Sequence, residues 1–155
     1  TGVDLLPETV DRLADIPNII GIKEASGSIE RAEEIIERCG DRIDVYCGED
    51  ARNLALINAG AKGCVSVTAN VAPRLMHDLC MAALAGDQQE AEALDARLAA
   101  LHNALFVETN PIPVKWALCE MGLIGPGMRL PMTPLSEQHH ETVRQALILA
   151  GVLQS

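Results

Sequence analysis

The sequence predicts a parallel α/β fold that gives way to helices alone in its C-terminal part. Up to Gly86, short apolar runs alternate with amphipathic stretches, and a few residues connect one to the next. Strands that alternate with helices in this way form right-handed βαβ units and a parallel sheet. After Gly86 the apolar residues recur only at helical spacing. Three strands cannot close a barrel, so we expect either a small open sheet or part of a larger parallel α/β structure.

Apolar periodicity and turn residues define the elements before Gly86. The first helix begins at Pro7, because proline suits a first helical turn, and ends near residues 16–17. A strand over residues 19–23 follows, and then a helix over residues 29–39 with Ser28 as N-cap and Gly40 as C-cap. Further strands are expected over residues 43–47 and 63–68, with a helix between them that Asp50 caps and Gly60 ends, and a last helix of this part begins at Pro73.

Helices account for the rest of the chain. A long helix is expected over residues 87–105, where leucines repeat at helical spacing in a stretch rich in alanine and glutamate. Pro111 and Pro113 begin another helix that Gly122 ends. A loop rich in glycine and proline follows, and Ser136 is expected to cap a final helix.

Composition excludes several classes of protein. The 155 residues carry a net charge of −10, which repels nucleic-acid phosphates, and only three aromatic residues occur. No segment has the length of a membrane helix, so a soluble cytoplasmic protein is expected. The five cysteines show no metal-like spacing and are expected to be reduced thiols. Of these, Cys39, Cys80 and Cys119 occupy helical apolar patterns as small hydrophobes.

A lysine interrupts the first expected strand. Residues 19–22 are isoleucine or glycine, and a run without polar alternation is typical of a strand buried on both faces. Lys23 shares a face with Gly21, which leaves room beside it. A buried ammonium must be paired, lose its proton or do chemistry, and a desolvated lysine becomes a nucleophilic amine. Lys23 is therefore the candidate catalytic residue; the alternative is that it pairs with an acid or reaches solvent.

Other candidate residues give weaker signals. Gly48 and Val65 lie near the ends of the next two strands, where parallel α/β folds bind their substrates. Glu49 and Asp50 are either acid/base carboxylates or simply first-turn acids of a helix. No phosphate-binding glycine motif is present. The histidines lack zinc-helix spacing and are expected to have surface or helix-packing roles: His77, His102, His139 and His140.

Five segments resemble, in order, the motifs of the 4-hydroxy-tetrahydrodipicolinate synthase family, also called dihydrodipicolinate synthases. Residues 21–27, Gly-Ile-Lys-Glu-Ala-Ser-Gly, resemble its Schiff-base lysine segment. Residues 48–50, 63–70, 110–115 and 130–134 resemble its later motifs. The Gly-Ile-Lys-Glu element recurs across the pyruvate-dependent class I aldolases, whereas the last two segments are more specific to the synthase.

The resemblance implies a fold. Family members are TIM (β/α)8 barrels with a C-terminal helical domain, and a whole barrel takes about 250 residues. Residues 1–86 would be the last strands and helices of such a barrel, from the sixth strand onward, and residues 87–155 the helical domain. The unclosed sheet is then explained by a chain that covers the latter part of the barrel.

The resemblance also implies a reaction. Lys23 would form an imine with pyruvate, and the derived enamine would add to aspartate 4-semialdehyde on the route to diaminopimelate and lysine. The main chain of Val65 would contact pyruvate, and Gly48 would line the pocket. No metal or organic cofactor is implied, and family members are commonly homotetramers.

The family's remaining site residues, a tyrosine and threonine relay and a carboxylate-binding arginine, would precede Thr1, as would the contacts for feedback by lysine. The chain alone is therefore expected to lack part of the site. Two alternatives remain: a related class I aldolase or lyase acting on a sugar acid, and a half-barrel fragment without catalysis.

Overall fold

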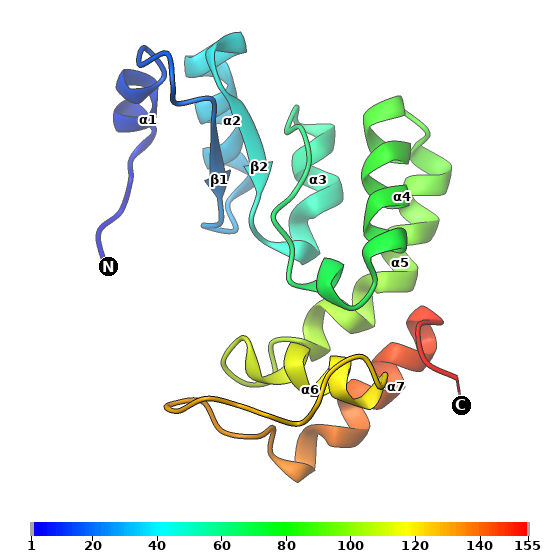
Figure 1. Cartoon of the computed structure of the whole chain (residues 1–155). Helices are drawn as coiled ribbons and strands as arrows, with labels where there is room; N and C mark the ends of the chain where they lie inside the picture. Colours follow the sequence, from blue (N-terminus) through cyan, green and yellow to red (C-terminus); the bar gives the residue numbers. More distant parts are fainter. Residues whose placement is uncertain (1, 155) are drawn as a thin grey trace.

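Two parallel strands and the helices beside them form the N-terminal lobe of the computed structural model, which describes residues 2–154 (Figure 1). Strands β1 (Gly21–Glu24) and β2 (Asp44–Cys47) pair in register, with Lys23 opposite Tyr46. Helices α1 (Pro7–Leu13) and α2 (Ile29–Cys39) pack on each other and bury one face of the pair. The predicted helix–strand–helix–strand order is confirmed here.

The third strand is shorter than predicted. Where residues 63–68 were expected to form a strand, only Cys64 bridges to Cys47 in parallel. The N–H groups of Val67 and Thr68 instead donate to the carboxylate of Asp50, so they cannot extend a ladder. A 3-10 turn, Thr68–Asn70, follows directly.

The predicted helix caps have mixed outcomes. Ser28 caps α2 by accepting from Arg31 N–H, as expected. Asp50 does not cap the next helix, because its carboxylate is bound to the segment after Cys64. Ser136 makes no side-chain cap either: a 3-10 turn precedes the last helix, and the Ser136 N–H donates to Glu108.

Strand β1 is not buried on both faces in the described structure. The prediction of a strand buried on both faces is therefore wrong. The face that carries Ile22 and Glu24 packs toward α1 and α2. Lys23 is exposed on the other face, and Ile20, which precedes β1, is 77% exposed. In addition, β1 pairs only with β2, so one edge of this strand has no partner strand among the described residues.

The remaining helices agree with the predicted pattern. The long helix α5 begins after Asp87, whose side chain accepts from Glu90 N–H. Gly86 and Gly151 end their helices with left-handed φ values of 78° and 75°. The helices are α3 (Asn53–Asn58), α4 (Pro73–Ala85), α5 (Gln88–Ala104), α6 (Ile112–Glu120) and α7 (His140–Ala150).

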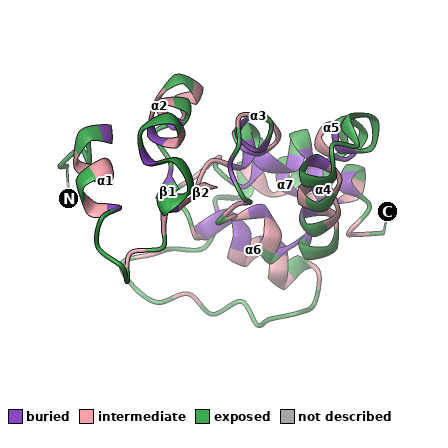
Figure 2. Cartoon of the chain, turned by 90° about the horizontal axis from the view of Figure 1, so that it is seen from above, coloured by how far each residue is buried: buried purple, intermediate pink, exposed green. Residues whose placement is uncertain are grey.

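One apolar core joins the α/β lobe to the helical lobe. It extends from Ile57 in α3 to Ala150 in α7, and α5, the first helix of the helical lobe (residues 87–154), packs on both α4 and α7 (Figure 1). In Figure 2 the buried sides of α3, α5 and α7 lie on the inside, whereas the loop after α6 is exposed. Leu98 and Leu101 of α5 are fully buried in this core.

Replacement of Leu98 by alanine is expected to lower the free energy of unfolding by about 2–5 kcal/mol, because a buried leucine leaves a cavity. Urea denaturation measures this loss. The control is Leu149→Ala on α7, where the side chain is 66% exposed and the expected change is below about 0.5 kcal/mol. Equal losses at the two positions would contradict the assigned core.

Candidate active site

The turn after β1 is built around the carboxylate of Glu24. This side chain is 6% exposed and accepts from Ser26 N–H at 2.9 Å. Gly27 follows with a φ of 79°, which a glycine adopts without strain, and Ser28 N–H donates to Ser26 Oγ. The local sequence therefore turns the chain sharply just after Lys23.

Gly48 provides the space in which the Lys23 side chain lies. Its N–H donates to the Glu24 carbonyl, which fixes the end of β2 against the end of β1. A Cβ atom at position 48 would lie 2.6 Å from Lys23 Cε and 2.6 Å from Ala25 Cβ. Only a glycine therefore lets the lysine pass along this strand end in its present conformation.

Tyr46 occupies the room beside Gly21 that the sequence had suggested for the lysine. A Cβ at Gly21 would lie 3.1 Å from Tyr46 Cε2, and the other edge of the ring approaches Gly63. The phenol donates to Asp44 Oδ2 at 3.1 Å, and this hydrogen bond raises the pKa of Tyr46. Tyr46 is paired with Lys23 across the two strands, and its ring lies on the same face of the sheet, next to Gly21.

Val65 lies at the end of the third parallel segment. Its N–H donates to the Cys47 carbonyl at 2.8 Å, and its side chain is 51% exposed. The structure thus brings Lys23, Gly48 and Val65 to the carboxyl ends of three consecutive parallel segments, where such folds bind substrates. Their catalytic and binding roles remain predictions.

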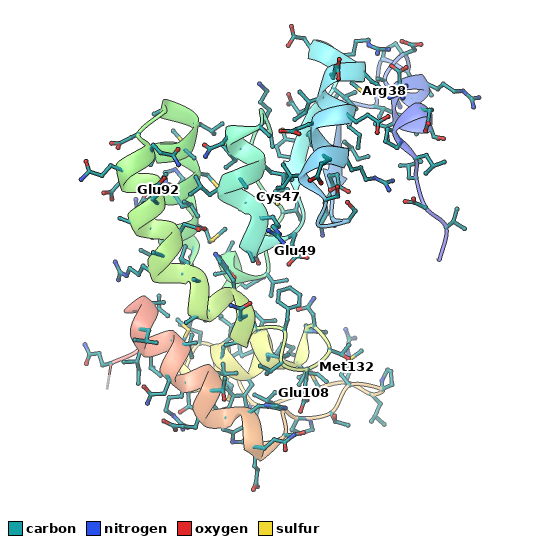
Figure 3. The ribbon with its side chains drawn as sticks, turned by 180° about the vertical axis from the view of Figure 1, so that it is seen from behind. Arg38, Cys47, Glu49, Glu92, Glu108 and Met132 are labelled. Carbon is teal, nitrogen blue, oxygen red and sulfur yellow. The ribbon has the colours of Figure 1, made fainter. Side chains whose placement is uncertain are left out.

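Asp50 anchors the segment that follows Val65. It is 3% exposed, and its Oδ2 accepts from both Val67 N–H and Thr68 N–H at 2.9 Å. Figure 3 labels Cys47 and Glu49, where the chain leaves β2 and approaches Asp50. The Cys47 thiol donates a hydrogen bond to the Glu49 carbonyl. Asp50 is an acid in the first turn of a short 3-10 helix, Asp50–Arg52, as one of its two interpretations predicted, but that interpretation did not include the contact with the later backbone. A role for Asp50 as an acid or base stays a prediction.

His102 connects the same segment to the helical lobe. This buried residue of α5 lies with its Nδ1 2.8 Å from Thr68 Oγ1. Burial lowers the pKa of His102, although the nearby carboxylates of Asp50 and Asp95 oppose the shift. The predicted packing role is therefore confirmed, and it extends to the strand end.

Replacement of Asp50 by alanine is expected to lower the free energy of unfolding by at least about 2 kcal/mol, because an unpaired buried N–H costs about 1–3 kcal/mol. Asp50→Asn is the matched variant, since its amide oxygen can accept from the same two N–H groups. Urea denaturation of both should show the smaller loss for the asparagine variant. If alanine were as well tolerated as asparagine, the two hydrogen bonds would not hold this segment.

Arg31 lies beside the turn after Lys23, with its Nε 3.8 Å from Glu24 Oε1, but it is already engaged. It makes a two-pronged ion pair with Asp4, at 2.8 and 3.0 Å, and contacts the Leu5 carbonyl. The hydrogen bond to Asp4 raises the pKa of Arg31 and lowers that of Asp4. Arg31 is thus held by this chain rather than presented to a ligand.

The two C-terminal motifs lie together away from the strand ends. Lys115 of α6 donates from Nζ to the Gly127 carbonyl, and residues of both motifs line one open groove that includes Pro111 and Pro131. Figure 3 shows Glu108 and Met132 in this region.

Within residues 2–154, no three acidic, cysteine or histidine side chains gather into a metal-binding group. None of the described helices is long and apolar enough to cross a membrane.

The fold and this site define a parallel α/β protein with a lysine at the strand ends. The comparison with family sequences agrees: residues 1–150 match the dihydrodipicolinate synthetase family. The chain belongs to this family. Its fold is the C-terminal part of a (β/α)8 barrel followed by helices, as the sequence predicted.

Individual relatives support the same conclusion. The chain is 67% identical to the 4-hydroxy-tetrahydrodipicolinate synthase of Alkalilimnicola ehrlichii over 153 residues, which are 99% of this chain and 52% of the relative. It is 60% identical to the synthase of Pseudomonas aeruginosa, again over 99% of the chain and 52% of the relative. The chain thus spans about half the length of the curated relatives it matches.

Solved structures of dihydrodipicolinate synthases superpose on this chain over about half of their own length. The dihydrodipicolinate synthase of Acinetobacter baumannii, complexed with pyruvate, superposes with a TM-score of 0.96 at 52% identity, over 99% of this chain and 53% of that one. A monomeric dihydrodipicolinate synthase variant superposes with a TM-score of 0.94 at 41% identity, over 99% of this chain and 52% of that one.

Proposed function

We propose that this chain supplies the imine-forming lysine of a 4-hydroxy-tetrahydrodipicolinate synthase. Membership of the family supports the proposal, and the observation that carries it is the passage of the Lys23 side chain over Gly48 at the strand ends. The substrates would be pyruvate and aspartate 4-semialdehyde.

Lys23 would react as an unprotonated amine. Its Nζ adds to the keto carbon of pyruvate, and loss of water gives an imine that withdraws electrons from the adjacent methyl group. Removal of a methyl proton gives an enamine, whose carbon attacks the aldehyde of aspartate 4-semialdehyde. Cyclisation through the amine of that substrate then releases Lys23. Neither a metal nor an organic cofactor enters this sequence.

The neighbouring residues would position the reactants. Gly48 leaves the path of the lysine open, because any side chain there meets Lys23 Cε. The Val65 N–H already donates a hydrogen bond to the Cys47 carbonyl. The Val65 carbonyl is therefore the main-chain group that would face pyruvate. Asp50 would hold that carbonyl in place through the two N–H groups that follow it.

The rest of the assembly is also part of the proposal. Residues 1–86 would form the end of the barrel and residues 87–155 the helical domain. A proton-relay tyrosine and threonine and a carboxylate-binding arginine would come from the portion of the relatives that this chain does not span. A cytoplasmic homotetramer is the proposed form, and a monomeric variant exists among the similar structures.

Borohydride trapping tests the proposal. The protein that carries this chain is incubated with pyruvate, reduced with sodium borohydride and digested, and the peptides are weighed. We expect the mass of a reduced pyruvyl group on the peptide that contains Lys23. The other two lysines of this chain, Lys62 and Lys115, should carry no added mass. In a separate sample without borohydride, aspartate 4-semialdehyde should be consumed with pyruvate in preference to sugar-derived aldehydes. An unmodified Lys23 in protein that turns over substrate would refute the proposal.

A further inference from the structure

Two cysteine thiols touch beside the strand end, outside the site described above. Cys64 belongs to the third parallel segment and Cys80 to α4, and their Sγ atoms lie 3.7 Å apart. Both side chains are half-buried, so a small reagent can approach them. By contrast, Cys39 and Cys47 are buried, and the Cys47 thiol contacts the Glu49 carbonyl.

The surroundings determine which sulfur carries the negative charge. The side-chain amide of Asn53 donates to Cys80 Sγ at 3.3 Å, so Cys80 is an acceptor, and either sulfur can donate in the second contact, between Cys80 and Cys64. These two hydrogen bonds lower the pKa of Cys80, with help from His77, whereas burial and Asp50 oppose the shift. The hydrogen bond with Cys80, and then burial, raise the pKa of Cys64.

We propose that Cys64 and Cys80 form an oxidation site that a hydroperoxide converts to a disulfide. The Cys80 thiolate attacks one peroxide oxygen, the O–O bond breaks, and with one proton the products are a sulfenic acid and water or an alcohol. The Cys64 thiol then attacks the Cys80 sulfur, an S–S bond forms, and the sulfenic oxygen leaves as water. Two thiols are thereby oxidised and one peroxide is reduced.

The geometry favours this pair over the other cysteines. A disulfide needs its sulfurs about 2 Å apart, so Cys64 and Cys80 must approach by less than the width of one atom. The residues on either side of Cys64 are hydrogen-bonded to Cys47, through the Gly63 carbonyl and the Val65 N–H. The backbone of this segment is therefore held, and rotation of the two cysteine side chains or a shift of α4 supplies the movement. The resulting bond would tie α4 to the segment that carries Val65.

Peptide mapping tests the proposal directly. The protein is exposed to hydrogen peroxide, its free thiols are alkylated, and it is digested with trypsin without reduction. Cleavage after Lys62, Arg74 and Arg97 places Cys64 in residues 63–74 and Cys80 in residues 75–97. We expect these two peptides to be joined, and Cys39, Cys47 and Cys119, each on its own peptide, to remain alkylated.

Single substitutions assign the roles. In Cys64→Ser the sulfenic acid at Cys80 should persist and be trapped by dimedone, whereas in Cys80→Ser residue 64 should remain an alkylatable thiol. Cys119→Ser is the control and should form the link as wild type does. At neutral pH, Cys80 in Cys64→Ser should react with peroxide at least about tenfold faster than Cys64 in Cys80→Ser. Dimedone on Cys64, or joined peptides that involve a different cysteine, would overturn the proposal. None of these readouts depends on Lys23.

Discussion

Replacement of Lys23 by arginine is expected to abolish borohydride trapping of pyruvate and to lower turnover by at least about 10³-fold, because the reaction loses its covalent step. A guanidinium is always protonated and forms no imine, yet it keeps the positive charge of lysine. Since Lys23 is exposed in the described chain, the longer side chain need not disturb the fold.

The matched control is Lys62→Arg. The Lys62 side chain is also exposed, and only its backbone N–H takes part in the strand contacts, through the Val45 carbonyl. Trapping and turnover should both remain at the wild-type level in this variant. A pyruvate adduct elsewhere in Lys23→Arg, with turnover preserved, would show that another amine forms the imine.

Replacement of Gly48 by alanine is expected to lower kcat/KM by about 10²-fold, because a small displacement of a reacting group costs that much. The new Cβ would lie 2.6 Å from Lys23 Cε, so the lysine must leave its present path. Initial rates at several pyruvate concentrations measure the effect, and the yield of the borohydride adduct on Lys23 should fall in parallel.

Gly125→Ala separates this displacement from a general effect of removing a glycine. No heavy atom lies within 4 Å of the place where a Cβ at Gly125 would stand. That variant should keep wild-type rates, and thermal unfolding should show whether Gly48→Ala is still folded. A folded Gly48→Ala protein with unchanged kcat/KM would mean that the lysine reaches pyruvate by another route.

Helices were predictable from the sequence because their signals are local. Pro73 at a first turn and Gly86 after a last one are read within one segment, and both were correct. The third strand was overestimated because its donors are taken by Asp50, seventeen or eighteen residues earlier in the chain. No local sequence pattern predicts a hydrogen-bond acceptor so far away in the chain.

The site was predicted in part for the same reason. Lys23, Gly48 and Val65 could be placed at strand ends from the apolar pattern, and the family resemblance gave them their expected roles. The contact of His102 with Thr68, thirty-four residues apart, could not be foreseen. The burial of Lys23 was wrongly predicted because burial depends on what covers the second face of β1, and the strand's own residues do not specify that.

The contact between His102 and Thr68 has a consequence for how this molecule opens. Because α5 lies in the same core as the residues after Val65, fraying of the helical lobe removes a support from the strand end. We therefore expect the amides of Val67 and Thr68 to belong to the same foldon as α5 and to exchange with solvent when that unit opens. A helix more than sixty residues after Lys23 in the sequence is thus expected to set how long the neighbourhood of Val65 persists between openings.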